Sequence, residues 1–272
     1  MKNISLGQYY PAKSYLHNAD PRIKLIMAMV FIVASFLCKN IFGFVGLLVY
    51  IFLLMLVSRI PMKTVLRSVR PILFIMAFTA VINVFWTSGE NLLFHWSFIS
   101  IYEEGLYNAF FMIVRITSLV IGASILITYT TTPIALTDAI ESLLSPLKKI
   151  KVPVHDFAMM MTIALRFIPT LMDETEKIMA AQKARGADFT NGSLIKRAKA
   201  LIPILIPLFV SAFRRADELA TAMECRCYRG GEGRTKLRAL KYRMSDFLGL
   251  FVVIVLCAAL VAFNFLNLGY TM

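Results

Sequence analysis

The chain has 272 residues, 58% of them hydrophobic, and a mean hydropathy of +0.71. Soluble globular domains are about 45–50% apolar, so the composition excludes an ordinary soluble domain and favours a protein whose apolar surface is covered by a lipid bilayer. The formal net charge of +13 would suit nucleic acid or anionic lipid, but we expect no nucleic-acid partner, because the basic residues gather in loops between apolar runs, as in the cytoplasmic loops of membrane proteins.

Five apolar runs predict an all-α integral membrane protein with about five transmembrane helices. The first run is short for a hydrocarbon core about 30 Å thick, because a helix rises about 1.5 Å per residue. It must therefore start near Pro21 or form a re-entrant hairpin with the second run. The fourth run carries Arg115, and because a mid-bilayer arginine costs about 2.5–3.5 kcal/mol, we expect its side chain to face protein or water. The runs are Leu25–Cys38, Ile41–Val57, Pro71 to about Trp86, Gly105 to about Tyr129, and Phe247–Leu268.

The basic residues also set the expected orientation. They cluster before the first run, between the second and third runs, and between the fourth and fifth runs, and such clusters stay on the cytoplasmic side. We therefore expect a cytoplasmic N-terminus, a membrane region over residues 1–131, a cytoplasmic region over 132–246, and a last membrane helix with an external tail over 247–272. The basic segment Arg59–Arg70 is expected to meet anionic lipid.

The cytoplasmic region is predicted to form about three helices, two of them long. The first begins at Pro133, behind the N-cap Thr132, and ends near Pro146; the second can run from Val154 to Gly186, and the third from Ser193 to about Tyr228. The second halves of the long helices resemble each other at an offset of 41 positions, and each has an apolar first half and a charged tip. The matched pairs are Glu176 with Asp217, Ile178 with Leu219, Ala181 with Ala222, and Arg185 with Arg226.

A nucleotide-binding motif is incomplete. A P-loop needs G-x-x-x-x-G-K-[ST], because backbone N–H groups and a lysine must hold the phosphates. The nearest stretch, YRGGEGRT, has Tyr228 at the first glycine position and Arg234 in place of the lysine. We therefore expect this segment to end a helix, and any ATP to be used by another chain.

Candidate catalytic and metal-binding residues do not form a recognisable site. An acidic cluster stands beside Lys177 and is interpreted as a solvated helix face with i,i+3 pairing, and no second ligand pair accompanies the C-x-C cysteines at zinc-site spacing. We expect no cofactor, no metal and no catalytic residue. The residues considered are His17, His95 and His155, the acidic cluster Asp173, Glu174 and Glu176, and the pair Cys225 and Cys227.

Three segments carry a resemblance to a known family. They are YLHNADPRIKL near the N-terminus, AQKARG at Ala181–Gly186, and RRADELATAMECRCYRGG, which matches a second Ala-Arg-Gly motif through Arg226. With these motifs and its apolar pattern, nearly the whole chain resembles the transmembrane T component of energy-coupling factor transporters, which import vitamins and metal ions in prokaryotes.

The resemblance implies a non-catalytic, multi-pass subunit of a prokaryotic cell membrane. Two cytoplasmic ATPase subunits would bind the tips of two crossed helices, and the chain would reorient a substrate-binding membrane subunit when the ATPases close. Where the family has Ala and Gly around the second arginine, this chain has two cysteines, so we expect that the helix can end later, at Gly230 or Gly231, with Arg226 a better coupling candidate than Arg229. The implied ATPase-coupling residues are Ala184, Arg185, Gly186, Cys225, Arg226 and Cys227.

Two other functions stay open at the level of the sequence. A secondary transporter would need paired intramembrane acids or broken helices at corresponding positions of two halves, and only Arg115 and the proline-interrupted helices point that way. A membrane enzyme acting on lipid or isoprenoid phosphates could use the basic helix tips, but no acid pair for magnesium is evident.

Overall fold

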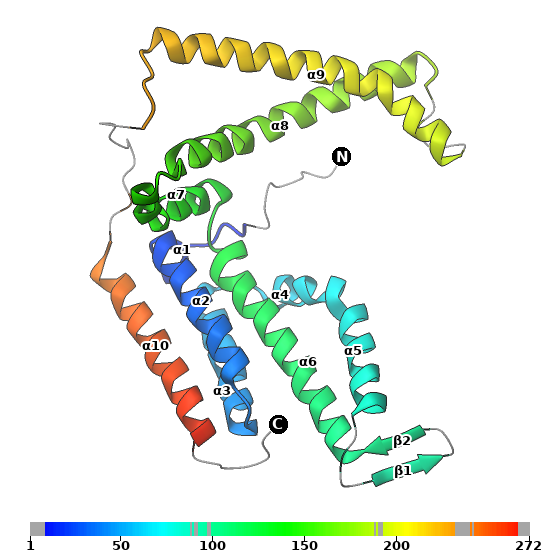
Figure 1. Ribbon diagram of the computed structural model, residues 1–272, viewed down its shortest axis with the longest axis vertical. Coiled ribbons are helices and arrows are strands. Elements are labelled where there is room, and N and C mark those ends of the chain that lie inside the picture. Colours follow the sequence, from blue (N-terminus) through cyan, green and yellow to red (C-terminus); the bar gives the residue numbers. More distant parts are fainter. Residues whose placement is uncertain are drawn as a thin grey trace. The chain divides into compact units, whose positions relative to one another are not determined.

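The computed structural model describes residues 9–87, 89, 92–96, 99–187, 189, 193–231, 240 and 242–265. The chain folds as two compact units, one made of Met1–Ala139 with Ala239–Met272 and the other of Ile140–Arg238. Helices dominate both units (Figure 1), which confirms the predicted helical class. The described residues add one short antiparallel hairpin between the third and fourth apolar runs, where no strand was predicted.

The first unit contains most of the elements in Figure 1. They are α1 (Tyr15–Asn18), α2 (Pro21–Leu37), α3 (Ile41–Ser58), α4 (Met62–Val69), the 3-10 turn η1 (Arg70–Ile72), α5 (Leu73–Trp86), β1 (Leu92–Trp96), β2 (Ile99–Tyr102), α6 (Glu103–Ala123), the π-helical turn η2 (Ser124–Tyr129) and α10 (Met244–Phe265). Helix α7 (Pro133–Leu143) crosses the boundary between the units.

The core of the first unit lies where α2, α3, α6 and α10 pack together. Phe31, Leu47 and Phe111 are almost fully buried, and the Phe111 ring stacks on Phe44 with centroids 4.9 Å apart. Helix α2 begins at Pro21 because the Asp20 carboxylate accepts a hydrogen bond from the N–H of Arg22 at 2.9 Å, which is a good N-cap followed by proline. The first apolar helix therefore begins at Pro21, as the first of the two expected alternatives requires, and reaches 17 residues.

Two cations of this unit are satisfied by backbone carbonyl groups. The Arg115 guanidinium donates to the carbonyl oxygen of Cys38 at 2.7 Å and lies over the Phe44 ring, so its side chain faces protein, as predicted. The Lys24 ammonium is buried and donates to the carbonyl oxygen of Thr130 at 2.9 Å, at the end of η2. Both contacts place a positive charge beside unpaired carbonyl oxygens at a helix end, where the helix dipole is negative.

Three helical stretches of the described chain are long and apolar enough to cross a membrane: Ile41–Ser58, Met62–Trp86 and Glu103–Tyr129. The apolar part of α10, Met244–Ala259, is shorter, and α2 has 17 residues. These lengths support a membrane protein, while the count of five transmembrane helices stays a prediction.

Two segments have a secondary structure that the sequence did not predict. The basic segment after α3 was treated as a loop, but its centre forms α4, because Val65 and Val69 recur at helical spacing and are buried on one face. The loop Thr87–Glu104 contains the strands β1 and β2, and its alternating aromatic and branched residues suit such a hairpin. Glu90 lies outside the described residues.

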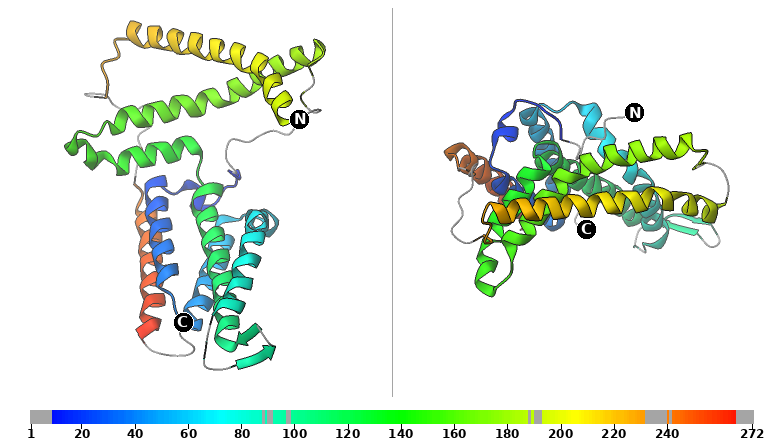
Figure 2. Two further views of the ribbon diagram at one scale, coloured as in Figure 1. Left: turned by 45° about the vertical axis from the view of Figure 1, so that its right-hand side comes forward. Right: turned by 90° about the horizontal axis from the view of Figure 1, so that it is seen from above.

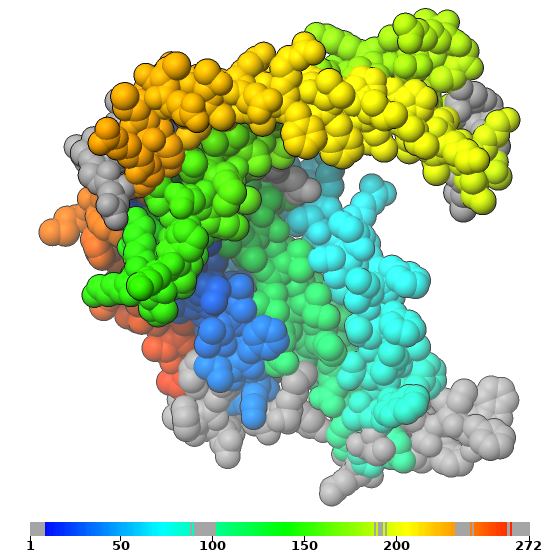
Figure 3. Space-filling view, turned by 45° about the horizontal axis from the view of Figure 1, so that its top comes forward, coloured from blue at the N-terminus to red at the C-terminus, as the bar shows by residue number. Residues whose placement is uncertain are grey.

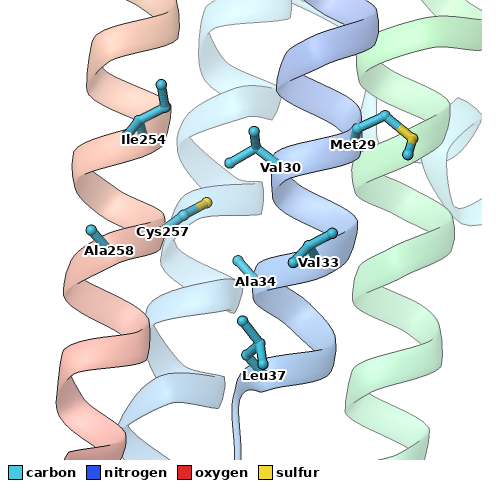
Figure 4. A pocket seen from close by; sticks show the side chains of 8 residues that line it. All are labelled: Met29, Val30, Val33, Ala34, Leu37, Ile254, Cys257 and Ala258. Carbon is cyan, nitrogen blue, oxygen red and sulfur yellow. The ribbon is translucent and has the colours of Figure 1, made fainter.

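An open apolar groove of about 460 Å³ lies between α2 and α10 (Figure 4). Val33 and Leu37 line it from α2, and Ile254 and Cys257 from α10. Its lining carries no charged side chain, so the groove suits lipid chains or an apolar helix rather than a polar ligand.

The second unit is built on two long helices, α8 (Val154–Ala184) and α9 (Leu194–Cys225), preceded by the end of α7 and the 3-10 turn η3 (Ser145–Ile150). Helices α8 and α9 run in opposite directions and cross, as Figures 1 and 2 show from three directions. The second long helix begins where predicted, because the Ser193 hydroxyl accepts a hydrogen bond from the N–H of Lys196.

Candidate functional site

The end of α8 has a defined backbone geometry. Arg185 is the C-cap residue, and Gly186 follows with a φ of 88°. The N–H of Gly186 donates to the carbonyl oxygen of Lys183, and the N–H of Ala187 donates to that of Gln182, each at 3.0 Å. This pair of bonds is the Schellman motif, which satisfies the last carbonyl groups of a helix and turns the chain away.

The end of α9 has the same geometry. Arg226 is the C-cap, and Cys227 follows with a φ of 54°. The N–H of Cys227 donates to the carbonyl oxygen of Glu224 at 2.8 Å, and the N–H of Tyr228 donates to that of Met223 at 3.0 Å. Each of these residues stands 41 positions after its counterpart in α8. The sequence repeat is therefore also a repeat of backbone structure.

The expectation that α9 could end later, at Gly230 or Gly231, is wrong. The helix ends at Cys225, because Cys227 adopts the left-handed conformation that the glycine at 186 adopts in α8. A side chain in this conformation costs about 1–2 kcal/mol. The two Schellman hydrogen bonds after α9 offset part of that cost, so the missing glycine does not move the helix end.

All six predicted coupling residues are exposed at these two ends. Arg185 and Arg226 take the same C-cap position, whereas Arg229 lies beyond the repeated motif. Among the described residues, neither Arg185 nor Arg226 takes part in an ion pair or a side-chain hydrogen bond. The structure thus brings the six residues together as two equivalent groups, Ala184–Gly186 and Cys225–Cys227, and does not join them into one site.

The two groups lie at opposite ends of the crossed helix pair, because α8 and α9 are antiparallel (Figure 3). Between them the helices are joined by an ion pair, in which the Arg215 guanidinium donates to the Glu174 carboxylate at 3.0 Å. Glu174 and Arg215 are themselves 41 positions apart, and each stands 11 residues before the C-cap arginine of its own helix. At about 1.5 Å per residue, each arginine lies roughly 16 Å beyond the crossing.

The electrostatics of the crossing favour a charged Glu174. A hydrogen bond from the Ser211 hydroxyl holds the pKa of the Glu174 carboxyl below its ordinary value, against the opposing effect of burial, and the positive charges of Arg215 and Lys177 lower this pKa further. The interpretation of this acidic cluster as a solvated face is therefore wrong for Glu174, whose main contacts come from α9. The sequence held one signal for the pair, which is that Glu174 and Arg215 occupy equivalent positions of the repeat.

A second contact ties the first part of this unit together. His155 Nδ1 lies 2.9 Å from Glu141 Oε1, so the end of α7 is joined to the start of α8. The segment after α9 also packs there, because a Cβ built on Gly231 would come within 2.4 Å of the His155 ring. His155 therefore has a structural partner, Glu141, that the spacing in the sequence did not indicate.

Metal-binding groups are absent from the part of the chain that the structure describes. No cluster of three or more His, Cys, Asp or Glu side chains occurs in it. Cys225 and Cys227 are exposed and unbridged. Arg234 of the incomplete P-loop lies outside the described residues.

Comparison with known proteins gives consistent results. The profile of the cobalt transport protein family (CbiQ) matches residues 12–237. The "Energy-coupling factor transporter transmembrane protein EcfT" of Ruminiclostridium cellulolyticum is 55% identical over 248 residues, which are 91% of this chain and 92% of that protein. Proteins of the same name from Clostridium kluyveri and Acidaminococcus fermentans are 51% and 49% identical, over 94% and 99% of this chain and 95% and 98% of their own lengths.

Proposed function

The chain belongs to the cobalt transport protein family as an energy-coupling factor transporter transmembrane component, and on this premise we propose that it transmits ATP-driven movement from two cytoplasmic ATPase subunits to a separate substrate-binding membrane subunit. The observation that carries the proposal is the pair of equivalent helix ends. Each presents an exposed C-cap arginine, and the two ends lie far apart on one crossed pair of helices.

Arginine suits such a mechanical contact. Its planar guanidinium offers five donors that can bind carboxylates and carbonyl oxygens in a fixed orientation. A Schellman end holds the C-cap backbone rigidly, so a force on Arg185 or Arg226 would pass into the whole helix. Two equivalent ends match two ATPase subunits, one at each end.

The crossing is proposed as the fulcrum. When the two ATPases approach each other, the helix ends would move together, and the pair would turn about the contact of Glu174 with Arg215. The opposite halves of α8 and α9 would then move the substrate-binding subunit. Their exposed apolar side chains favour a hydrophobic membrane partner, and on α9 these are Leu201, Ile202, Leu205, Ile206, Phe209 and Val210.

The proposed topology follows the charge distribution. Residues 1–131 and 247–272 would lie in or beyond the membrane, and 132–246 in the cytoplasm, with a cytoplasmic N-terminus in a prokaryotic cell membrane. The chain itself would catalyse nothing, since the ATPase subunits would hydrolyse ATP and the third subunit would bind the vitamin or metal ion. Arg115 gives no support to a self-contained transporter, because it donates to the carbonyl oxygen of Cys38.

The experiment is uptake by the complete complex with both C-cap arginines replaced. We expect Arg185→Ala with Arg226→Ala to keep membrane insertion and to abolish coupled uptake in proteoliposomes. The matched control, Lys183→Ala with Arg229→Ala, removes the same charge next to the same helix ends and should retain most of the activity. Normal uptake by the first variant, or an equal loss in both, would reject the assigned role of the C-cap arginines.

A further inference from the structure

Helix α4 carries a concentrated positive charge that the proposed function does not use. Arg59, Lys63, Arg67 and Arg70 fall within 12 residues, and the segment Arg59–Arg70 contains no acidic residue. All four basic side chains are exposed, and none forms an ion pair with another described residue.

The exposed face of α4 is apolar as well as basic. Val65 and Val69 are buried, whereas Met62 is 53% and Leu66 is 59% exposed. Met62 and Leu66 are four residues apart, as are Lys63 and Arg67, so the helix shows adjacent apolar and basic rows. A face of this kind is typical of a helix that lies in a membrane interface.

Contacts within the first unit show at which end of this unit α4 lies. The Tyr129 hydroxyl donates to the carbonyl oxygen of Thr64 at 3.1 Å, so α4 packs against the last residue of η2. Figures 1 and 2 show α4 lying across the end of α5. Helix α4 is therefore at the end of the membrane unit where α6 ends and the chain continues into α7.

Helix α5 adds a second reason to expect the membrane surface here. The stretch Met62–Trp86 reaches 25 residues only because it includes α4 and η1. Helix α5 alone has 14 residues and rises roughly 21 Å, less than the roughly 30 Å of a hydrocarbon core. A bilayer accommodates a short span by thinning locally and by the snorkelling of flanking basic residues. Arg67 and Arg70 stand directly before α5 and can hold lipid phosphates at that lower level.

We propose that α4 is an interfacial helix that binds the anionic headgroups of the leaflet on the α7 side. Met62 and Leu66 reach the acyl boundary, and Lys63, Arg67 and Arg70 contact phosphate. An acidic protein would use the charge but would leave Met62 and Leu66 unexplained. The helix would hold the membrane unit at a fixed depth, a role that does not depend on which partners bind the helix ends.

The test measures the preference of the complete chain in vesicles for spin-labelled phosphatidylglycerol over spin-labelled phosphatidylcholine. Each Lys or Arg near an anionic surface corresponds to about a fivefold preference. We expect Lys63→Gln, Arg67→Gln and Arg70→Gln together to lower the preference at least about fivefold. Raising the ionic strength from about 0.15 M to about 1 M should lower the wild-type preference, because the Debye length falls from about 8 Å to about 3 Å.

Two further variants make the test specific. The control variant replaces three basic residues of α9, by Lys196→Gln, Arg197→Gln and Lys199→Gln. It removes the same amount of charge and should leave the lipid preference unchanged. Met62→Ser with Leu66→Ser should weaken the binding of phosphatidylglycerol and of phosphatidylcholine to this surface to the same extent. The proposal is overturned if the α4 charge variant keeps the wild-type preference, if the control loses as much, or if the α4 variant loses a protein subunit from the purified complex while its lipid preference is unchanged.

Discussion

The two units of this chain differ in how far they bury their large apolar side chains. The first unit buries large side chains such as Phe31, Leu47 and Phe111 in a core shared by four helices. In the second unit, Phe209 and Phe213 of α9 are 60% and 69% exposed, and α8 and α9 meet at one crossing. The first unit therefore has its own core, whereas the second leaves large apolar side chains of α9 exposed, which agrees with the proposed binding of a membrane partner.

The largest expected effect tests this contrast directly. Phe111→Ala should lower the free energy of unfolding by about 3–5 kcal/mol, because it removes a buried ring that stacks on Phe44. Phe209→Ala, the same change on the exposed face of α9, should alter it by about 0.5 kcal/mol or less. Thermal unfolding of the purified chain in detergent measures both. Equal losses would contradict the difference between the units.

A smaller effect compares the two helix ends. Cys227→Gly should stabilise the end of α9 by about 1 kcal/mol, because glycine adopts the left-handed conformation without the cost that Cys227 bears. Gly186→Ala should destabilise the end of α8 by a similar amount. Hydrogen exchange at the last amides of each helix reports the two changes separately, and the equivalence of the ends fails if both substitutions act in the same direction.

The smallest effect concerns the crossing and depends on pH. Because the folded-state pKa of Glu174 is lowered, its contacts with α9 contribute stability above the ordinary glutamate pKa of about 4.3, and the contribution is lost as the pH falls through the lowered value. Distance measurements between spin labels on α8 and α9 should show the pair loosening in that acidic range. In Glu174→Gln this pH dependence should disappear. If the variant loosens over the same pH range as the wild type, the pH dependence comes from a titrating group other than Glu174.

Local patterns were sufficient to predict the long helices. The caps at Pro133 and Ser193 and the apolar runs gave starts and lengths close to those of α7, α8 and α9. The 41-residue repeat also indicated two equivalent tips, and the structure adds that both ends form the same two Schellman hydrogen bonds. The roles assigned to the six tip residues stay predictions.

Contacts between distant segments could not be predicted in the same way. Glu174 and Arg215 pair because α8 and α9 cross at that point, and His155 and Glu141 pair because α7 folds back on α8. Neither geometry is encoded in local spacing. The end of α9 was predicted too late in the chain for a related reason, since the two Schellman hydrogen bonds form there although Cys227 must adopt a left-handed conformation.

We propose that each helix end binds one ATPase subunit through its C-cap arginine. Native mass spectrometry of the detergent-purified complex without nucleotide counts the subunits directly. The account predicts two ATPase subunits on the wild-type chain, one on Arg185→Ala or Arg226→Ala alone, and none on the double variant. Two subunits retained by the double variant would contradict it.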